Sequence, residues 1–412
     1  MGTPTGTAGV ESVGDLAELP GVREALQWFT REKQWINEQH LELCRIPAPT
    51  FLEHERAVWF AAQFRALGCG VQIDRAGNVI AHLDPRARGP YVAITAHLDT
   101  VLAPRSREEV TISSNGRFLG PGVSDNGAGL AGLLAIARAI RMSPPMEDLC
   151  HSFVLVANVG EEGEGNLSGM RQLCRPGGFA RKVGAFIVLD GANTSYITTQ
   201  ALGSRRFEVT FTGPGGHSWS DFGTGNPVHA LSRAVSYFSD VKLNGTPRSS
   251  VNIGWIEGGT SVNAIPALAR AKVDIRSESN EKMDELVAFL NEAVEQAQET
   301  ENLRATGGRV SVKVKEIGSR PAGKLAPGAA ILRYLRAVDA HLGIRATVDC
   351  ASTDANVPLS LGLPALSIGA GGSGGGAHTS QEWYSSDGRD LALKRVLLTA
   401  VLLLRDPSLA PR

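Results

Sequence analysis

In the first half of the chain, short β-type runs, several of them apolar throughout, alternate with segments of helical periodicity. The runs that predict strands are VQID, NVIAHL, YVAITAHLD, HSFVLVAN and AFIVLD. Apolar positions with helical spacing predict helices at Val22–Leu43, Leu52–Leu67, Ala128–Arg141 and Ser168–Cys174. Strands that are apolar throughout are typical of a sheet covered by helices on both faces. This part of the sequence therefore predicts an α/β fold, with a mixed sheet between two layers of helices.

After Gly203 the pattern changes to amphipathic strands. The predicted elements are the strand RRFEVTFTG, a helix at Asn226–Ser239, the strands SVNIGWIEGG and LARAKVDIRS, a helix at Glu281–Glu299 and the strand RVSVKVKEI. Their order, β-α-β-β-α-β, is that of a ferredoxin-like unit. The α/β pattern then resumes with a helix at Ala329–Leu342 and the strand LPALSIG. We therefore expect residues 204–320 to form an inserted domain and residues 1–203 and 321–412 to form one discontinuous domain.

Length, charge and cysteine usage narrow the class of protein. A chain of 412 residues favours two domains, and its formal net charge of −1 provides no field that would attract nucleic acid or an anionic membrane. No apolar stretch approaches the roughly 20 residues that span a bilayer, and residues 1–20, rich in Gly, Thr and Pro, resemble an irregular segment more than a signal peptide. The five cysteines are scattered without CxxC spacing. We expect a cytoplasmic protein that binds neither nucleic acid nor membrane.

Ionisable residues recur where the predicted strands and glycine-rich loops end. They are His97 and Asp99 after YVAIT, Glu161 and Glu162 after FVLVANVG, Asp190 after AFIVL, Asp125 in GPGVSDNGAG and His378 after a glycine run. In open α/β sheets, ligands bind beyond the carboxyl ends of the strands. Imidazoles and carboxylates are groups that zinc takes as ligands.

Each of these signals is weak alone. A His-x-Asp pair is usually structural, an Asp before a helix is most often an N-cap, and a Glu-Glu pair in a loop is normally solvated. Together they favour a metal site, because carboxylates that converge on one edge of a sheet repel each other unless a cation lies between them.

Several segments jointly carry a family resemblance. They are AHLDTV (96–101), GPGVSDNGAG (120–129), GEEGEGN (160–166), VLDG (188–191), GPGGHS (213–218), SVNAIP (261–266), VDIRS (273–277) and AHTSQEW (377–383). In this order they resemble the zinc metallopeptidase family that contains peptidase T, carboxypeptidase G, acetylornithine deacetylase, succinyl-diaminopimelate desuccinylase and aminoacylase. The resemblance implies an exopeptidase catalytic domain and a lid through which two chains dimerise.

The resemblance also implies two Zn²⁺ ions per chain, which Co²⁺ or Mn²⁺ could replace. Asp125 would bridge the two ions, His97 and Asp190 would complete one site, and Glu162 and His378 would complete the other. Glu161 would be the general base that activates a water molecule shared by the metals. The carboxylate of Asp99 would accept the other ring N–H of His97 and so set its tautomer.

The lid would supply the remaining contacts to a short peptide. His217 would reach the carbonyl oxygen of the substrate, often from the partner subunit, and Asn263 would hold the substrate backbone. Arg276 would pair with a carboxylate, for which its planar fork is suited. Arg276 could equally form a salt bridge within the lid, and Asn263 could simply be a turn residue.

Two departures from the family pattern bear on function. Asn126 follows Asp125 where many relatives have a second Asp, which should change the polarity of the loop and leave the metal count unchanged. Asp190 stands where several deacylase and carboxypeptidase relatives have Glu, and this favours an aminopeptidase or tripeptidase that acts from the free amino end.

Three alternatives stay open. A deacylase of N-acyl amino acids or a carboxypeptidase could have the same fold and metal ligands. A protein that only binds ligands is disfavoured, because all the candidate ligands and Glu161 are present. A serine hydrolase is suggested only by a G-x-S-x-G match at residues 371–375 within the glycine run, without the strand and helix that such a motif needs.

Overall fold

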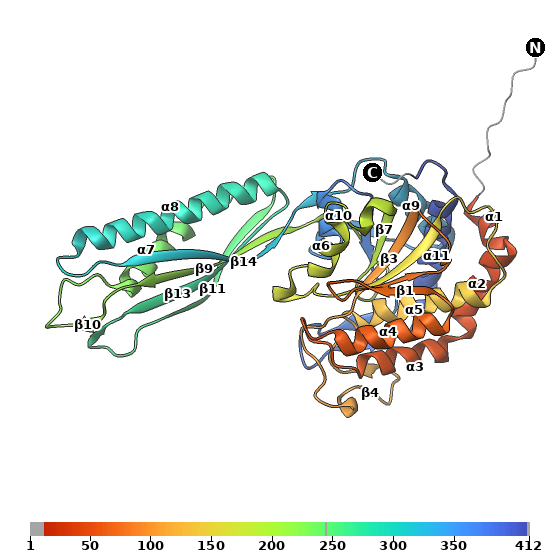
Figure 1. Ribbon diagram of the computed structural model, residues 1–412, viewed down its shortest axis with the longest axis horizontal. Helices are drawn as coiled ribbons and strands as arrows, with labels where there is room; N and C mark the ends of the chain where they lie inside the picture. The colour runs from red at the N-terminus through yellow and green to blue at the C-terminus, as the bar shows by residue number, and fades with distance from the viewer. Residues whose placement is uncertain (1–11, 244, 410–412) are drawn as a thin grey trace, which may run out of the picture. The chain divides into compact units, whose positions relative to one another are not determined.

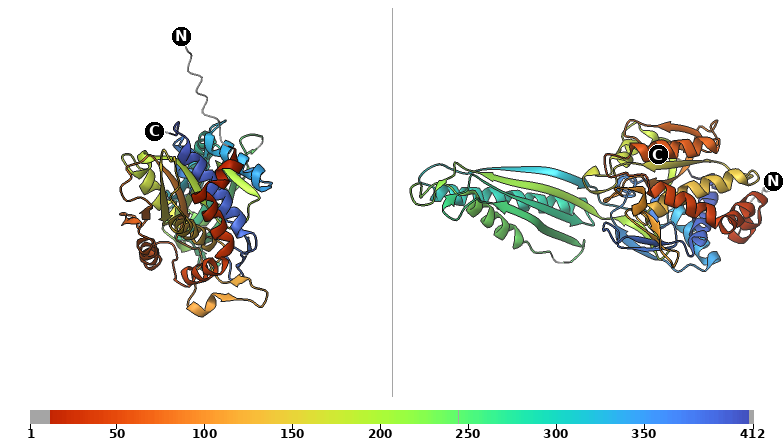
Figure 2. Two further views of the ribbon diagram at one scale, coloured as in Figure 1. Left: turned by 90° about the vertical axis from the view of Figure 1, so that its right-hand side faces the viewer. Right: turned by 90° about the horizontal axis from the view of Figure 1, so that it is seen from below.

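The computed structural model describes residues 12–243 and 245–409, which fall into two compact units. The larger unit comprises the chain up to Thr199, Lys324–Asp349 and the chain from Thr353 onward. The smaller unit comprises Gln200–Gly323 and Cys350–Ser352. Each unit has its own sheet and core (Figures 1 and 2).

A mixed sheet forms the centre of the larger unit. Its order is β1 (Gly70–Ile73), β2 (Val79–His82), β6 (Ser152–Asn158), β3 (Tyr91–His97), β7 (Val183–Leu189), β17 (Ala365–Ile368), β8 (Tyr196–Ala201) and β15 (Gly323–Lys324), with β16 (Thr347–Ala351) paired to β8. The strands β6, β3, β7 and β17 run parallel to one another, whereas β1, β2 and β8 pair antiparallel. The carboxyl ends of four neighbouring strands therefore meet at one edge of the sheet.

Helices cover both faces of this sheet, as the apolar strands predict. Every residue of β3 and β7 is buried. The helices α5 (Gly127–Met142) and α11 (Arg389–Arg405) pack on one face, and α6 (Ser168–Cys174) and α10 (Asn356–Ser360) lie on the other (Figure 1). No helix in the described part of the chain combines the length and apolarity that crossing a membrane requires.

The N-terminal helices differ from the sequence prediction. The helix predicted over Val22–Leu43 is two helices, α2 (Pro20–Arg31) and α3 (Lys33–Cys44), and the chain turns between them at Glu32. A short helix, α1 (Val13–Glu18), begins within the segment predicted to be irregular. It forms because Ser12 and Asp15 cap its first turn reciprocally. Residues 1–11 of that segment lie outside the described residues.

The remaining elements of the larger unit agree with prediction or add to it. The helices predicted after Pro49 and after Gly328 are α4 (His54–Ala66) and α9 (Ala330–Leu342). A small antiparallel sheet joins β18 (Ser373–Gly375), β19 (Trp383–Ser385), β5 (Phe118–Leu119) and β4 (Thr111–Ile112). This sheet brings the segment before Asp125 beside the segment after the C-terminal glycine run.

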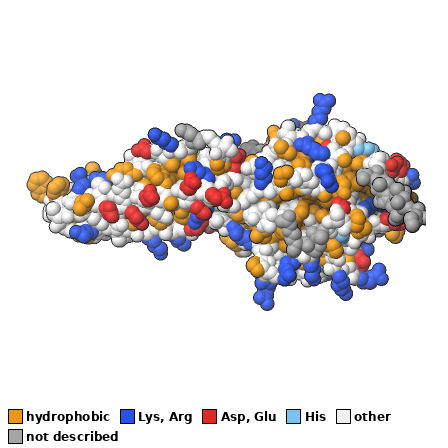
Figure 3. Space-filling model, turned by 90° about the horizontal axis from the view of Figure 1, so that it is seen from above, with side chains coloured by type: hydrophobic (Ala, Val, Ile, Leu, Met, Phe, Trp, Pro, Cys, Tyr) orange, Lys and Arg blue, Asp and Glu red, His pale blue; other side chains and the backbone are white. Residues whose placement is uncertain are grey.

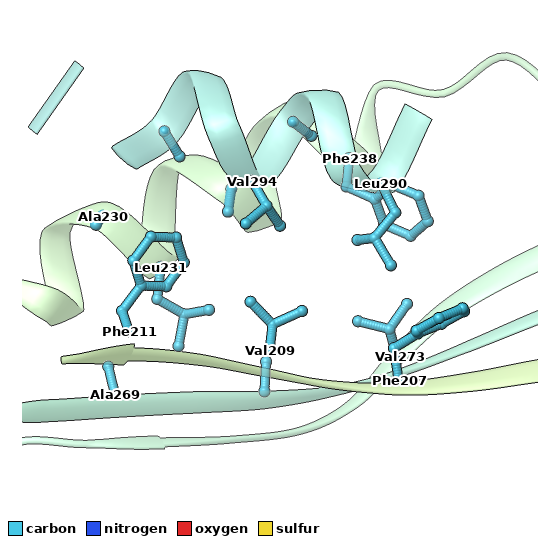
Figure 4. Close-up of a cluster of buried hydrophobic side chains, with 14 of the residues drawn as sticks. Phe207, Val209, Phe211, Ala230, Leu231, Phe238, Ala269, Val273, Leu290 and Val294 are labelled. Carbon is cyan, nitrogen blue, oxygen red and sulfur yellow. The ribbon is translucent and has the colours of Figure 1, made fainter. Parts of the chain in front are cut away.

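The smaller unit has the predicted β-α-β-β-α-β order. Its elements are β9 (Gly203–Thr212), α7 (Pro227–Ser239), β11 (Ser249–Gly258), β13 (Leu268–Ser277), α8 (Asn280–Arg304) and β14 (Ser311–Arg320). The strands form an antiparallel sheet in the order β11-β13-β9-β14. Phe207, Val209 and Phe211 alternate along β9, so all three point toward α7 and α8 (Figure 4). The ferredoxin-like fold of this unit is confirmed.

Candidate metal centre

Strand ends and two loops bring the predicted ligands of the larger unit together. His97 is the last residue of β3, Asp190 follows β7, and Glu162 follows β6. The Nε2 atom of His97 lies 3.2 Å from Asp125 Oδ1 and 3.9 Å from Asp190 Oδ1. The sheet edge therefore gathers an imidazole and several carboxylates, as predicted from the sequence.

The other oxygen of Asp125 faces a second histidine. His378 Nε2 lies 3.1 Å from Asp125 Oδ2 and 3.1 Å from Glu162 Oε1. His378 has a left-handed φ of 64°, which is uncommon for a residue other than glycine and occurs where function holds the backbone. Asp125 thus lies between two groups of side chains, one containing His97 and Asp190, the other containing Glu162 and His378.

The contacts within this cluster fit a bound cation. Donor atoms of His97, Asp125 and Glu162 all lie within 4.8 Å of one another. Asp125 Oδ1 is buried and has no hydrogen-bond partner, although it faces His97 Nε2. Buried polar atoms in native proteins almost always have a partner, and a metal ion between this oxygen and this nitrogen would supply one.

Charge within the cluster shifts the pKa values of its members. Burial acts to raise the pKa of Asp125, but the imidazoles of His378 and His97 outweigh it and hold that pKa below its usual range. The carboxylate of Asp125 is the main reason that the pKa of His378 rises to about 9. Burial raises the pKa of Glu162. The imidazoles therefore hold protons that metal ions would displace.

The second nitrogen of His97 faces two acceptors of Asp99, and the main-chain carbonyl is the nearer one. Its Nδ1 lies 3.0 Å from the main-chain carbonyl oxygen of Asp99 and 3.6 Å from the Asp99 carboxylate. The carboxylate also accepts hydrogen bonds from the Thr50 hydroxyl and from the N–H groups of Glu161 and Glu162. The carbonyl of Asp99 therefore sets the tautomer that leaves His97 Nε2 free to bind metal, and the Asp99 carboxylate positions the Glu161-Glu162 segment.

Asn126 explains one departure from the family pattern. Its Oδ1 accepts from the N–H groups of Gly129 and Gly191, and its Nδ2 donates to the carbonyl of Leu189. An Asp could not make the last of these bonds, because an ionised carboxylate has no donor. The Asp125-Asn126 peptide bond is cis. Asn126 thus connects the start of α5 to the segment that carries Asp190.

Sequence reasoning missed Glu382, which holds the loop that carries Asp125. Its buried carboxylate accepts from the N–H groups of Gly122 (2.8 Å), Ser124 (2.7 Å) and Asp125 (2.8 Å). Gly122 has a φ of 73°, and a Cβ there would lie 2.4 Å from the Thr100 side chain. Glu382 is separated from Asp125 by 257 residues, so only the fold reveals the contact. The signal available in the sequence is its place four residues after His378.

We expect Glu382→Gln to weaken metal binding by about 10–100-fold, the usual cost of losing an outer-sphere partner. The amide nitrogen of Gln cannot accept a hydrogen bond, so at least one loop N–H group loses its partner. Titration of the metal-free protein with zinc measures the effect. Glu55→Gln, at an exposed position of α4, is the matched control. Equal zinc affinity for both variants would show that Glu382 does not position Asp125.

A second buried carboxylate lies behind the cluster. Asp354 Oδ2 accepts from Asn158 Nδ2 at 2.6 Å, and Asn158 pairs with His97 in the register of β6 and β3. Burial raises the pKa of Asp354 to about 7. Its contact with Asn158 places Asp354 among the groups that surround the ligands, a role that its position in the sequence did not indicate.

The predicted substrate residues His217 and Asn263 lie together in the smaller unit. The short strands β10 (Gly216–His217) and β12 (Ala264–Ile265) pair with each other, and Ser218 N donates to the Asn263 carbonyl. His217 Nδ1 accepts from the N–H groups of Trp219 and Ser220 at 3.2 Å and 3.4 Å. In the neutral ring the proton is therefore on Nε2, which makes His217 a hydrogen-bond donor at its far atom.

Arg276 lies near the end of β13 in the four-stranded sheet, far from the start of that strand. It pairs with Asp274 at 2.7 Å, the intra-lid salt bridge considered as an alternative. His217 and Asn263 lie beyond the end of β13 that begins at Leu268. Leu268 and Arg276 are eight residues apart along β13, which corresponds to about 26 Å at about 3.3 Å per residue. The smaller unit thus carries two separate groups of candidate substrate residues.

Comparisons with known proteins match both units. The model described as peptidase family M28 matches residues 78–212, and that described as a peptidase dimerisation domain matches residues 200–302. A succinyl-diaminopimelate desuccinylase of Corynebacterium glutamicum is 28% identical over 337 residues, which cover 80% of this chain and 86% of the relative.

Solved structures share the fold. A tripeptidase from Staphylococcus aureus has a TM-score of 0.73 at 20% identity, covering 91% of this chain and 99% of its own. A Bacillus subtilis protein, described as a dinuclear metal binding peptidase, has a TM-score of 0.66 at 17% identity, covering 92% and 99%.

Proposed function

Because the chain belongs to the zinc metallopeptidase family, we propose that it is a di-zinc exopeptidase that hydrolyses di- and tripeptides from their free amino end. The observation that carries the two-metal proposal is the position of Asp125. Its two oxygens face different histidines, and each histidine has a further carboxylate at hand, Asp190 for His97 and Glu162 for His378. A carboxylate placed in this way would be able to bridge two ions.

The residues around the cluster have distinct tasks in this reaction. Bound zinc ions would supply Lewis-acid polarisation of the attacking water and of the scissile carbonyl. Glu161 is buried beside the ligand Glu162, and its main chain is held by Asp99. In the proposal its carboxylate removes a proton from the water and delivers it to the departing amine. His217 donates a hydrogen bond from its Nε2–H group to the carbonyl oxygen as negative charge develops there.

The distance between the two groups of candidate substrate residues in the smaller unit supports a substrate site that two chains of a homodimer share. A tripeptide spans about 11 Å when extended, at about 3.6 Å per residue. His217 with Asn263 and Arg276 of one chain are much farther apart than this, so one short peptide cannot touch both groups of the same chain. If all three bind substrate, one group comes from the partner subunit. The match to a dimerisation domain supports the same arrangement.

Recognition of both peptide termini would explain why the proposed substrates are only two or three residues long. A free α-amino group needs a carboxylate, and Asp190 is exposed enough to face it at the cluster. The terminal α-carboxylate would take Arg276 away from Asp274, since Arg pairs bidentately with carboxylates. Burying either terminus unpaired would cost several kcal/mol, roughly 2 or more.

Metal analysis tests the two-ion proposal. Purified protein, stripped of metal and reloaded with zinc, should approach two ions per chain. Chelation should abolish peptide hydrolysis, and zinc should restore it. A stoichiometry near zero, with hydrolysis unaffected by the chelator, would rule out the metal mechanism.

A matched substrate series tests the amino-end proposal. The series consists of a tripeptide, its N-acetyl form and its C-terminal amide. We expect acetylation to lower kcat/KM by more than about tenfold, because a charged hydrogen bond is lost, and amidation to have a smaller effect. Efficient hydrolysis of the acetylated peptide would instead favour a deacylase or carboxypeptidase. The similarity to a desuccinylase makes the deacylase the second candidate.

A further inference from the structure

A loop before α4 forms hydrogen bonds with two segments of the candidate metal centre. The Thr50 hydroxyl donates to the Asp99 carboxylate at 3.0 Å. Three residues later, the Glu53 carboxylate accepts from the N–H groups of Gly160 and Phe51, each at 3.1 Å. Gly160 directly precedes Glu161. The loop is therefore held in place by the same segments that carry the general base and its positioning carboxylate.

This loop exposes two large apolar side chains beside the metal centre. Phe51 is 64% exposed and Leu52 is 68% exposed. The segment that follows Asp99 lies alongside, because Thr100 N donates to the Ala48 carbonyl and Thr100 pairs with Pro49. It exposes Val101 and Leu102. We call these four residues, Phe51, Leu52, Val101 and Leu102, the apolar rim.

The backbone of the rim indicates that it is built for a ligand. Phe51 has a left-handed φ of 76°, a conformation that costs free energy for a bulky residue and that Gly or Asn adopts more easily. Strain of this kind persists where the surrounding structure enforces it, and it concentrates at ligand sites. Four exposed apolar side chains in one place are also unusual away from binding surfaces.

The smaller unit has a similar arrangement around its own substrate residues. Trp219, Phe222 and Val262 are 86%, 87% and 102% exposed. Trp219 and Phe222 lie in the loop after His217, and Val262 directly precedes Asn263. Hydrophobic side chains gather at the end of this unit that carries β10 (Figure 3). Both surfaces that the proposed function assigns to the peptide are therefore apolar around their polar groups.

We propose that the substrate carries a large aliphatic or aromatic side chain next to the scissile bond, and that the apolar rim binds it. This inference rests on the proposed function, and it specifies the kind of side chain that the substrate carries. The contacts of Thr50 and Glu53 hold the loop of the rim against Asp99 and against the segment that precedes Glu161, which makes the rim available to a side chain next to a carbonyl held at the metals. A polar side chain would leave water-accessible rim atoms uncovered and would gain no burial.

A panel of dipeptides tests the preference in the wild-type, zinc-loaded protein. The panel is Leu-Ala, Phe-Ala, Ala-Ala and Ser-Ala, the same pairs reversed, and the matching N-acetyl amino acids. We expect the best Leu or Phe substrate to exceed its Ser counterpart by at least about tenfold in kcat/KM, the discrimination typical of an apolar pocket. Equal rates across side chains, or a preference for Ser, would overturn the inference while leaving the peptidase proposal intact.

Variants locate the preference in the rim. Phe51→Gly removes the ring and accepts the left-handed backbone, and Leu52→Ser removes the second side chain. Each substitution should lower kcat/KM for the Leu and Phe substrates by about tenfold. The value of kcat/KM for the Ala and Ser substrates should change by less than about twofold, and the zinc content should stay the same. Met142→Ala is the matched control, because Met142 is 61% exposed and ends α5, about 22 Å along the helix from its start beside Asp125.

Two further results would overturn the inference. If the rim variants slow every substrate equally and shift the protein from dimer to monomer, the rim is a contact between subunits. If the wild-type protein binds zinc but cleaves neither the dipeptides nor the N-acetyl amino acids, the proposed function fails together with the substrate class. The apolar preference is supported only when discrimination between side chains falls and zinc content does not.

Discussion

Replacing Glu161 by Gln should lower turnover of a short peptide by about 10²–10⁴-fold, the usual effect of removing a general base, while both zinc ions stay bound. Gln is isosteric with Glu but cannot take a proton from water. In the proposed mechanism Glu161 takes up a proton and holds no zinc, so its replacement leaves the ligands in place. Steady-state kinetics and metal analysis of the same preparation measure the two effects separately.

The adjacent residue provides the control for this experiment. Glu162 lies 3.1 Å from His378 Nε2, so Glu162→Gln should weaken one metal site and lower the zinc content at limiting zinc. The two substitutions make the same chemical change at neighbouring positions. If Glu161→Gln loses zinc and Glu162→Gln retains it, the two roles are reversed.

The second large effect is expected at His217. His217→Ala should lower kcat by about 10²–10³-fold, the cost of losing one donor to a developing oxyanion, without changing zinc content. The loop geometry supports this role, because two backbone N–H groups occupy Nδ1 and leave the proton on the exposed Nε2. His229→Ala is the control, since His229 is an exposed histidine on α7 of the same unit. Equal kinetics for the two variants would exclude His217 from the reaction.

Complementation between two inactive chains tests whether His217 acts across the dimer. Glu161→Gln supplies an intact His217, and His217→Ala supplies an intact Glu161. Mixed dimers should recover up to about a quarter of wild-type activity, because random exchange gives half heterodimers with one complete site each. Dimers that have demonstrably exchanged subunits and remain inactive would place the contact within one chain.

The sequence predicts that the side chains of the candidate metal ligands cluster, because residues at the ends of apolar strands can be recognised in it. His97, Glu162 and Asp190 each follow an apolar run, and parallel strands that end at one edge must bring such residues together. The structure places all three with Asp125 and His378 in one cluster. The glycine-rich loops are equally visible, because few other residues tolerate their conformations.

Other features depend on contacts that the sequence does not show. Glu382 lies in a polar stretch and looks like a solvated residue until the loop around Asp125 folds over it. The helix α11 is buried on nearly every side, so its apolar residues show no amphipathic period. Phe51 would be expected inside a core, and its exposure is known only from the structure.

The two ends of the smaller unit lie next to each other, so the segment between them can be removed without leaving a wide gap in the chain. Ser204, the second residue of β9, pairs directly with Arg320, where β14 ends, and paired antiparallel residues have Cα atoms about 5 Å apart. Such a gap can be closed by a two-residue turn. A chain with the segment between them removed keeps His97, Asp125, Glu162, Asp190 and His378. Excision of this segment, with such a turn in its place, should therefore leave a shorter protein that keeps the candidate metal ligands and lacks the inserted unit.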